Sequence, residues 1–150
     1  MIISVAVFSQ EKPQKKPKTF SLENLDMKAS IYKIVEEMPR FPGCEDESLD
    51  KKVKEACAKV KFNNYITEQL ESRKDEFDIN VEASAVVQFL VYHDAKVEFG
   101  GINKSSDVKF EAVVKEIVES MNSMREKWIP GKQFDTTVTV LLTQVVDYKP

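Results

Sequence analysis

The chain has 150 residues, of which 42% are hydrophobic and 31% are charged. This balance is typical of one folded globular domain and differs from that of a disordered chain. The formal net charge of −3 argues against a nucleic-acid partner, because domains that bind nucleic acid usually carry an excess of basic residues. No apolar run approaches the roughly 20 residues that a membrane-spanning helix needs.

The N-terminal part of the chain differs in composition from the rest. Residues 1–10 are apolar and uncharged and end at Ser9-Gln10, which predicts the remnant of a secretory signal peptide. An N-terminal β-strand is the alternative. Residues 11–29 begin with a run rich in lysine and proline, so we expect an extended, solvated linker there. The folded domain should then span residues 30–150.

The first half of this domain predicts one strand followed by helix. β-Branched and aromatic residues within 30–37 predict a short strand, which the segment 39–43 should end with its prolines and glycine. From Ser48, the expected N-cap, apolar residues recur at helical spacing. Near Lys61 the apolar stripe changes direction, which predicts a bend or two consecutive helices. The first stripe consists of Leu49, Val53, Ala56, Cys57 and Val60, and the second of Phe62, Tyr65, Ile66 and Leu70. Residues 71–80 show no periodicity and predict a loop.

The second half predicts a hairpin, a helix and a final strand. Residues 83–92 and 96–102 are rich in strand formers on either side of a short turn, which is typical of a β-hairpin. Residues 110–121 form an amphipathic helical pattern. Residues 128–133 predict a turn, and residues 136–148 predict the last strand. We therefore expect an α+β fold in which helices pack on one face of a small antiparallel β-sheet.

No pattern in the sequence predicts catalysis. The single histidine, His93, falls in the expected hairpin turn, and none of the common hydrolase, metalloprotease or phosphate-loop motifs is present. A zinc site would need more ligands than His93 and the two cysteines provide. Trp128 is better explained as a core residue than as a ligand-stacking residue, and Gly100-Gly101 as a bulge than as an anion site. We expect no enzyme activity, no cofactor and no metal.

Two motifs resemble those of a known family. Residues 35–46 (VEEMPRFPGCED) are similar to the E-x-M-P-x-F-P-G motif that opens TonB C-terminal domains of the Bacteroidetes type. Residues 128–133 (WIPGKQ) resemble the W-x-P-G-K-Q motif that precedes the last strand of that family. The expected helix, hairpin and helix lie between them in the family's order, so the resemblance covers about residues 31–148.

The resemblance implies a function and a location. Domains of this family act in the periplasm and bind a peptide of an outer-membrane receptor, which adds as a strand to the edge of the sheet. It implies that the last strand is the binding edge, with the contacts at Val138, Val140, Leu142, Gln144 and Val146. It also implies a link to TonB-dependent transport and makes a homodimer through the sheets an open possibility. We expect the protein to be periplasmic or secreted.

The chain departs from the family pattern at residues 69–73, 92–95 and 134–138, where the family's usual turn motifs are replaced. It also contains neither the membrane helix nor the long proline-rich spacer of family transducers. A divergent member is therefore expected. The alternative function is a secreted or periplasmic binding or structural protein that keeps the fold without energy transduction.

The two cysteines, Cys44 and Cys57, predict a disulfide if the protein is exported. A pair of buried thiols is the alternative. A disulfide would tie the Pro-Gly segment to the first helix.

Overall fold

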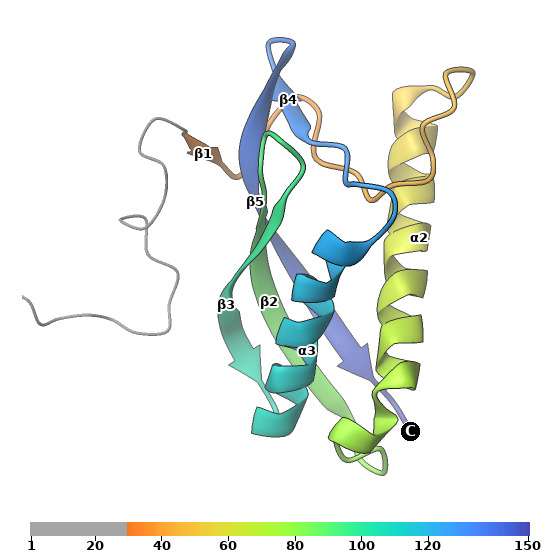
Figure 1. Ribbon diagram of the computed structural model, residues 1–150, viewed down its shortest axis with the longest axis vertical. Coiled ribbons are helices and arrows are strands. Elements are labelled where there is room, and N and C mark those ends of the chain that lie inside the picture. Colours follow the sequence, from red (N-terminus) through yellow and green to blue (C-terminus); the bar gives the residue numbers. More distant parts are fainter. Residues whose placement is uncertain (1–29) are drawn as a thin grey trace, which may run out of the picture.

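The computed structural model describes residues 30–150, so the expected signal-peptide remnant (1–10) and linker (11–29) lie outside the described residues. The elements follow the predicted order (Figure 1). They are β1 (Ile31–Tyr32), α2 (Lys51–Ser72), a 3-10 turn (Lys74–Glu76), β2 (Ala83–Val91), β3 (Val97–Ser105), α3 (Val108–Ser120), a second 3-10 turn (Met121–Ser123), β4 (Gly131–Gln133) and β5 (Thr136–Tyr148). The predicted α+β class is confirmed.

The sheet is built around the long strand β5. The strand order is β1-β5-β2-β3, and β4 pairs with the beginning of β5. β5 runs antiparallel to β2 and β4, whereas β1 runs parallel to it, with Ile31 opposite Thr139. The sheet is thus mixed and not wholly antiparallel, and the two residues of β1 are the reason.

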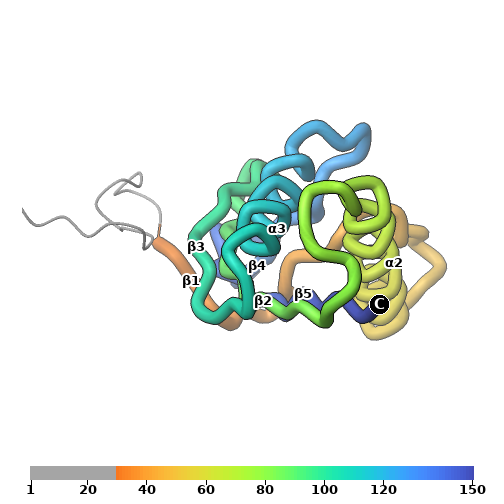
Figure 2. Tube along the Cα trace, turned by 90° about the horizontal axis from the view of Figure 1, so that it is seen from below, coloured from red at the N-terminus to blue at the C-terminus, as the bar shows by residue number. Residues whose placement is uncertain are grey.

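Both helices cover the same side of the sheet. Viewed from below, α3 lies over β2 and β3, and α2 lies beside β5 (Figure 2). The buried stripe of α3 includes Phe110, Val114 and Ile117, which pack on inward-facing residues of β2. At the α2 end of the core, the aromatic rings of Phe41, Phe62 and Trp128 meet at centroid distances of 5.2 to 5.6 Å. Each ring buried in this way stabilises the fold by about 1.5–3 kcal/mol.

Helix α2 corrects two predictions. It is one continuous helix of 22 residues through Lys61, without a bend or break, and its N-cap is Asp50, not Ser48. The Asp50 carboxylate accepts a hydrogen bond from the Val53 N–H, which satisfies one of the free donors of the first turn. The buried stripe consists of Ala58, Phe62, Ile66 and Leu70. The stripe expected upstream was wrong because its members Val53 and Val60 are exposed.

The segment before the last strand is also different from the prediction. Residues 128–133 are not a turn, because Ile129 bridges to Arg40 and Gly131–Gln133 forms β4. The turn is Phe134-Asp135, where both residues have positive φ, as two-residue hairpin turns require. At Gly131, a Cβ would lie 2.8 Å from Val140 Cγ2, so only glycine lets β4 approach β5 this closely. The last strand itself is confirmed at Thr136–Tyr148.

Candidate partner-binding edge of the sheet

Strand β5 changes its surroundings halfway along its length. Residues 136–138 pair with β4, and Val140 pairs with Tyr32 of β1 on one side and Val91 of β2 on the other. From Leu141 to Tyr148, β2 is the only strand of the described chain that pairs with β5. The second half of β5 is therefore an open edge of the sheet.

The direction of the backbone groups on this edge follows from strand β2. Ser84 exchanges hydrogen bonds with Ser106, beyond the end of β3, through both its N–H and its carbonyl, so the even-numbered residues of β2 point toward β3. The odd-numbered residues of β2 then point toward β5, where the unbroken register places them opposite even-numbered residues. The odd-numbered residues of β5 therefore direct their N–H and carbonyl groups away from the sheet.

One contact supports this assignment. The Val145 carbonyl accepts a hydrogen bond from the amide of its own neighbour, Gln144, at 2.8 Å. A carbonyl that bonded to β2 would not need such a partner. The outward backbone groups thus belong to the set Leu141, Thr143, Val145 and Asp147. The Leu141 N–H is already used, because the parallel pairing of Tyr32 with Val140 is made through the neighbours of Val140.

The structure gives different surroundings to the contact residues expected from the sequence. Val140 and Val146 are buried in the core, and Val138 pairs with Gly131 of β4. Leu142 and Gln144 are partly buried and line a cavity beside the open edge. All of them are even-numbered, so their side chains face the helices, and those in the open half of β5 direct their backbone at β2.

The cavity lies between the open edge and helix α2. It has a volume of about 350 Å³ and is bounded by β5 at residues 142–144, by α2 at residues 55–62, and by the segment 38–41. Phe89 and Trp128 also line it. Its lining is largely apolar and aromatic, and its charged members are Arg40, Glu55 and Lys59.

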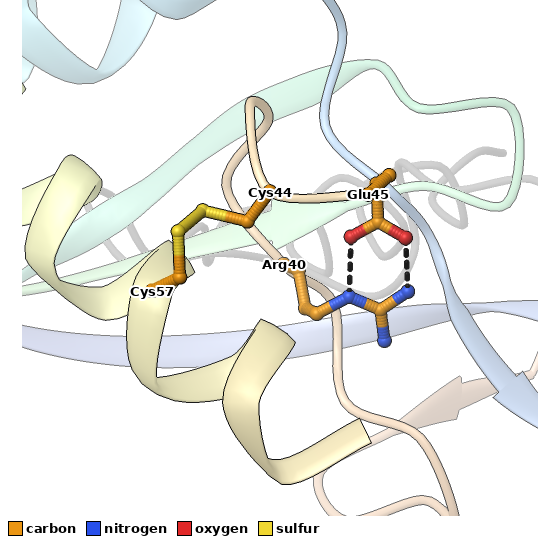
Figure 3. Close-up of a disulfide and its surroundings, with 4 residues drawn as sticks. All are labelled: Arg40, Cys44, Glu45 and Cys57. Carbon is orange, nitrogen blue, oxygen red and sulfur yellow. Dashed lines mark hydrogen bonds and ion pairs between the residues drawn. A yellow bond between two sulfur atoms is a disulfide. The ribbon is translucent and has the colours of Figure 1, made fainter. Parts of the chain in front are cut away.

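The wall formed by the segment 38–45 is fastened at several points. Figure 3 shows two of them: the disulfide between Cys44 and Cys57 of α2, and the paired hydrogen bonds from Arg40 to Glu45. Both Arg40–Glu45 distances are 2.7 Å, and hydrogen bonding to the guanidinium holds the pKa of the Glu45 carboxyl below its usual value. Arg40 also exchanges backbone hydrogen bonds with Ile129. The predicted disulfide is thus present, and it holds one wall of the cavity against α2.

The other residues singled out from the sequence have structural surroundings. His93 lies in the exposed hairpin turn, where its N–H donates to Thr139 Oγ1. Gly100 is the extra residue of a β-bulge in β3, as expected. Trp128 is 4% exposed and belongs to the core, as expected, but its indole N–H is buried without a hydrogen-bond acceptor. Residues 30–150 contain no cluster of histidine, cysteine and carboxylate side chains that could hold a metal ion.

The sequence did not indicate the outward-facing backbone set or the cavity. Alternation along β5 shows which side chains share a face, but the backbone direction depends on the pairing of β2 with both of its neighbours. Of the two buried α2 residues that line the cavity, the stripes expected from the sequence included Phe62 but not Ala58. The disulfide was the one part of this site with a clear sequence signal.

No helix of the part of the chain that the structure describes is long and apolar enough to span a membrane. Comparison with protein-family models, curated proteins and solved structures found no match to this chain.

Proposed function

We propose that this domain is a protein-interaction module that binds an extended segment of a partner by strand addition to residues 141–148 of β5. The observation that carries the proposal is the row of outward backbone groups that runs from the Leu141 carbonyl through Thr143 and Val145 to Asp147. Unpaired N–H and carbonyl groups on an edge strand form a template for another strand. Backbone hydrogen bonds then supply affinity, and the side chains of alternate residues supply specificity.

The side chains along this edge favour an added strand. Thr143 is exposed, and Val145 is 51% exposed, which is unusual for a β-branched apolar residue of this strand. Asp147 is the one charged residue here, and its carboxylate accepts a hydrogen bond from Ser84. Residues 141–148 contain no lysine or proline, the residues with which proteins commonly block an edge strand, and Lys149 and Pro150 follow only beyond the paired residues.

We further propose that the protein works in an oxidising compartment outside the cytoplasm. The disulfide supports this location, because such bonds are rare in the reducing cytosol. The resemblance of residues 35–46 and 128–133 to the TonB C-terminal domain family supports the periplasm, and it supports a segment of a TonB-dependent outer-membrane receptor as the partner.

Selection from a library of displayed linear peptides tests the proposal. Peptides selected on the parent domain should lose binding to Thr143→Pro by about tenfold or more, because proline removes an outward N–H that a partner strand would use. Thr143→Ala is the matched control, since it keeps the N–H and should bind within about twofold of the parent. Circular dichroism should show both variants folded, because β2 does not use this N–H.

Three outcomes would overturn strand addition at this edge. They are equal binding by folded Thr143→Pro and the parent, unfolding of Thr143→Pro, and a selection that yields no peptide sensitive to this substitution. The link to transport has its own test in a second peptide set, taken from the periplasmic segments of TonB-dependent receptors. If displayed peptides bind and none of the receptor peptides does, the module stands and the link to TonB-dependent transport is rejected.

A further inference from the structure

The cavity between β5 and α2 lies where an added strand would place its side chains. In a sheet, residues directly opposite each other on neighbouring strands point to the same face. A partner residue opposite Leu142 or Gln144 would therefore point toward the helices, on the side where α2 bounds the cavity, whose lining on β5 is Leu142, Thr143 and Gln144. A partner residue opposite Thr143 would point to the other face, away from the cavity.

The lining of the cavity defines the chemistry of its occupant. Phe41, Phe62, Phe89 and Trp128 contribute to it, and these rings already meet one another mostly edge to face. A further ring in such surroundings gains about 0.5–1.5 kcal/mol beyond the burial of its area. The volume of about 350 Å³ is at the small end of the range of about 300–1,000 Å³ for ligand pockets, which leaves room for one large side chain.

The charges near the cavity do not select a charged occupant. Both hydrogen bonds of the Arg40 guanidinium to Glu45 are short, and Glu37 lies 3.6 Å from the same group, so this cation is already neutralised. Glu55 and Lys59 stand four residues apart on α2, where opposite charges attract each other. An acidic or basic side chain would enter the largely apolar cavity without a free counter-charge, which is costly.

The wall of the cavity is fixed before any partner binds. The disulfide holds the segment 38–45 against α2, and Phe41 stacks on Phe62 of α2 with a centroid distance of 5.4 Å. The Arg40–Glu45 pair lies within the segment and fixes its conformation. A site that is ordered in advance loses less conformational entropy on binding. Such prior order favours a pocket that selects one side chain.

We propose that this cavity takes one aromatic side chain of the added segment, that of the residue opposite Leu142 or Gln144. The inference rests on the proposed strand addition and adds a sequence preference to it. The partner is thus an extended segment with an aromatic residue at one fixed position, flanked by residues whose side chains point away from the domain.

Peptides selected by display on the parent domain provide the probe. Aligned peptides should share one aromatic position, and its replacement by alanine should weaken binding by about tenfold or more. Lys59→Phe should block the cavity mouth from α2 and weaken binding by a similar factor. Val60→Phe is the matched control, because it adds the same side chain at the next residue, which is exposed and does not line the cavity.

Trp128 offers a direct measurement of occupancy, because it is the only tryptophan of the chain. A peptide that carries para-nitrophenylalanine at the shared aromatic position should quench the emission of Trp128. The same residue moved by one position should quench much less, because adjacent residues of a strand point to opposite faces.

Different experimental results would overturn the proposed aromatic pocket and the proposed strand addition. Binding that is lost in Thr143→Pro but tolerates alanine at every peptide position would overturn the pocket and leave strand addition intact. Equal or stronger binding by Lys59→Phe than by Val60→Phe, or equal quenching from both nitrophenylalanine positions, would also overturn the pocket. Binding that is indifferent to Thr143→Pro would overturn both proposals.

Discussion

The sheet has two edges, formed by the second half of β5 and by β3, and they differ in regularity. β5 keeps one register with β2 along the whole pairing from Val140 to Tyr148. β3 shifts its register against the same strand twice, which leaves Gly100 and Asn103 without a partner. The two edges flank the same central strand β2, so the difference lies in the edge strands themselves.

The comparison teaches which edge can accept another strand. Bulges twist a strand and interrupt its row of hydrogen-bonding groups, and proteins use them to prevent association at an edge. β3 therefore carries a protected edge, whereas β5 carries a regular one with a fixed cavity beside it. An edge that is left regular in a domain that protects the other one is the better candidate for binding.

The largest effect on stability is expected at Gln144, which lies between Thr143 and Val145 and directs its backbone N–H at β2. Gln144→Pro would remove an N–H that bonds to β2 and leave the acceptor on Val87 without a partner. We expect the free energy of unfolding to fall by about 3 kcal/mol or more, whereas Thr143→Pro should change it by less than about 1 kcal/mol. Urea unfolding of both variants measures the contrast. Equal losses would mean that both sides of β5 are paired.

The disulfide is expected to make the next largest contribution to stability, and it lies near the β5 edge of the sheet and not near the β3 edge. It joins residues 13 apart in sequence, and closing a loop of this size stabilises a fold by about 3 kcal/mol in the chain-entropy model. Reduction should lower the melting temperature by about 2–4 °C per kcal/mol and weaken peptide binding, while hydrogen exchange in β3 should stay unchanged. The variant with serine at both Cys44 and Cys57 should not respond to reductant. Two free thiols, counted after the protein from its natural source is denatured without reductant, would contradict the disulfide.

A smaller effect, with a defined pH dependence, is expected from Glu45→Gln. Hydrogen bonding to Arg40 lowers the pKa of Glu45 in the folded protein, so its stabilising effect is complete above the usual value of 4.5 and is lost as the pH falls below it. We expect the substitution to cost about 1–2 kcal/mol at neutral pH, since Arg40 is 8% exposed and keeps only weaker partners. The difference between variant and parent should shrink in urea melts as the pH is lowered below 4.5, because Glu45 of the parent then takes up a proton. A difference in the free energy of unfolding that stays constant with pH would show that the Arg40–Glu45 ion pair does not stabilise the fold.

The regular edge and its cavity were predictable from the sequence to different degrees. The bounds of β5 and the hairpin of β2 and β3 follow from local strand propensity, and the disulfide follows from having only two cysteines. The N-cap at Asp50 was missed because Ser48 and Asp50 offer the same chemistry two residues apart, and only the Val53 N–H decides between them. The edge of β5 is open beyond Val140 because β1 ends at Tyr32. A strand that filled the predicted range 30–37 would have paired with more of β5 and closed part of this edge.

The smallest effect is expected at the β3 edge. In Gly100→Ala, the new Cβ would lie 3.0 Å from the Gln88 carbonyl oxygen, a tight contact that a bulge can relieve by a small shift. Alanine also reduces the freedom of the unfolded chain, which favours folding by about 0.4–1 kcal/mol and offsets much of the strain. We expect the free energy of unfolding to change by less than about 1 kcal/mol and peptide affinity to stay within about twofold of the parent. Titration of the selected peptides against this variant and against Thr143→Pro measures both edges with the same probe. A loss of affinity in Gly100→Ala comparable to that in Thr143→Pro would show that the bulged edge also contacts the partner, and the functional distinction between the two edges would then be wrong.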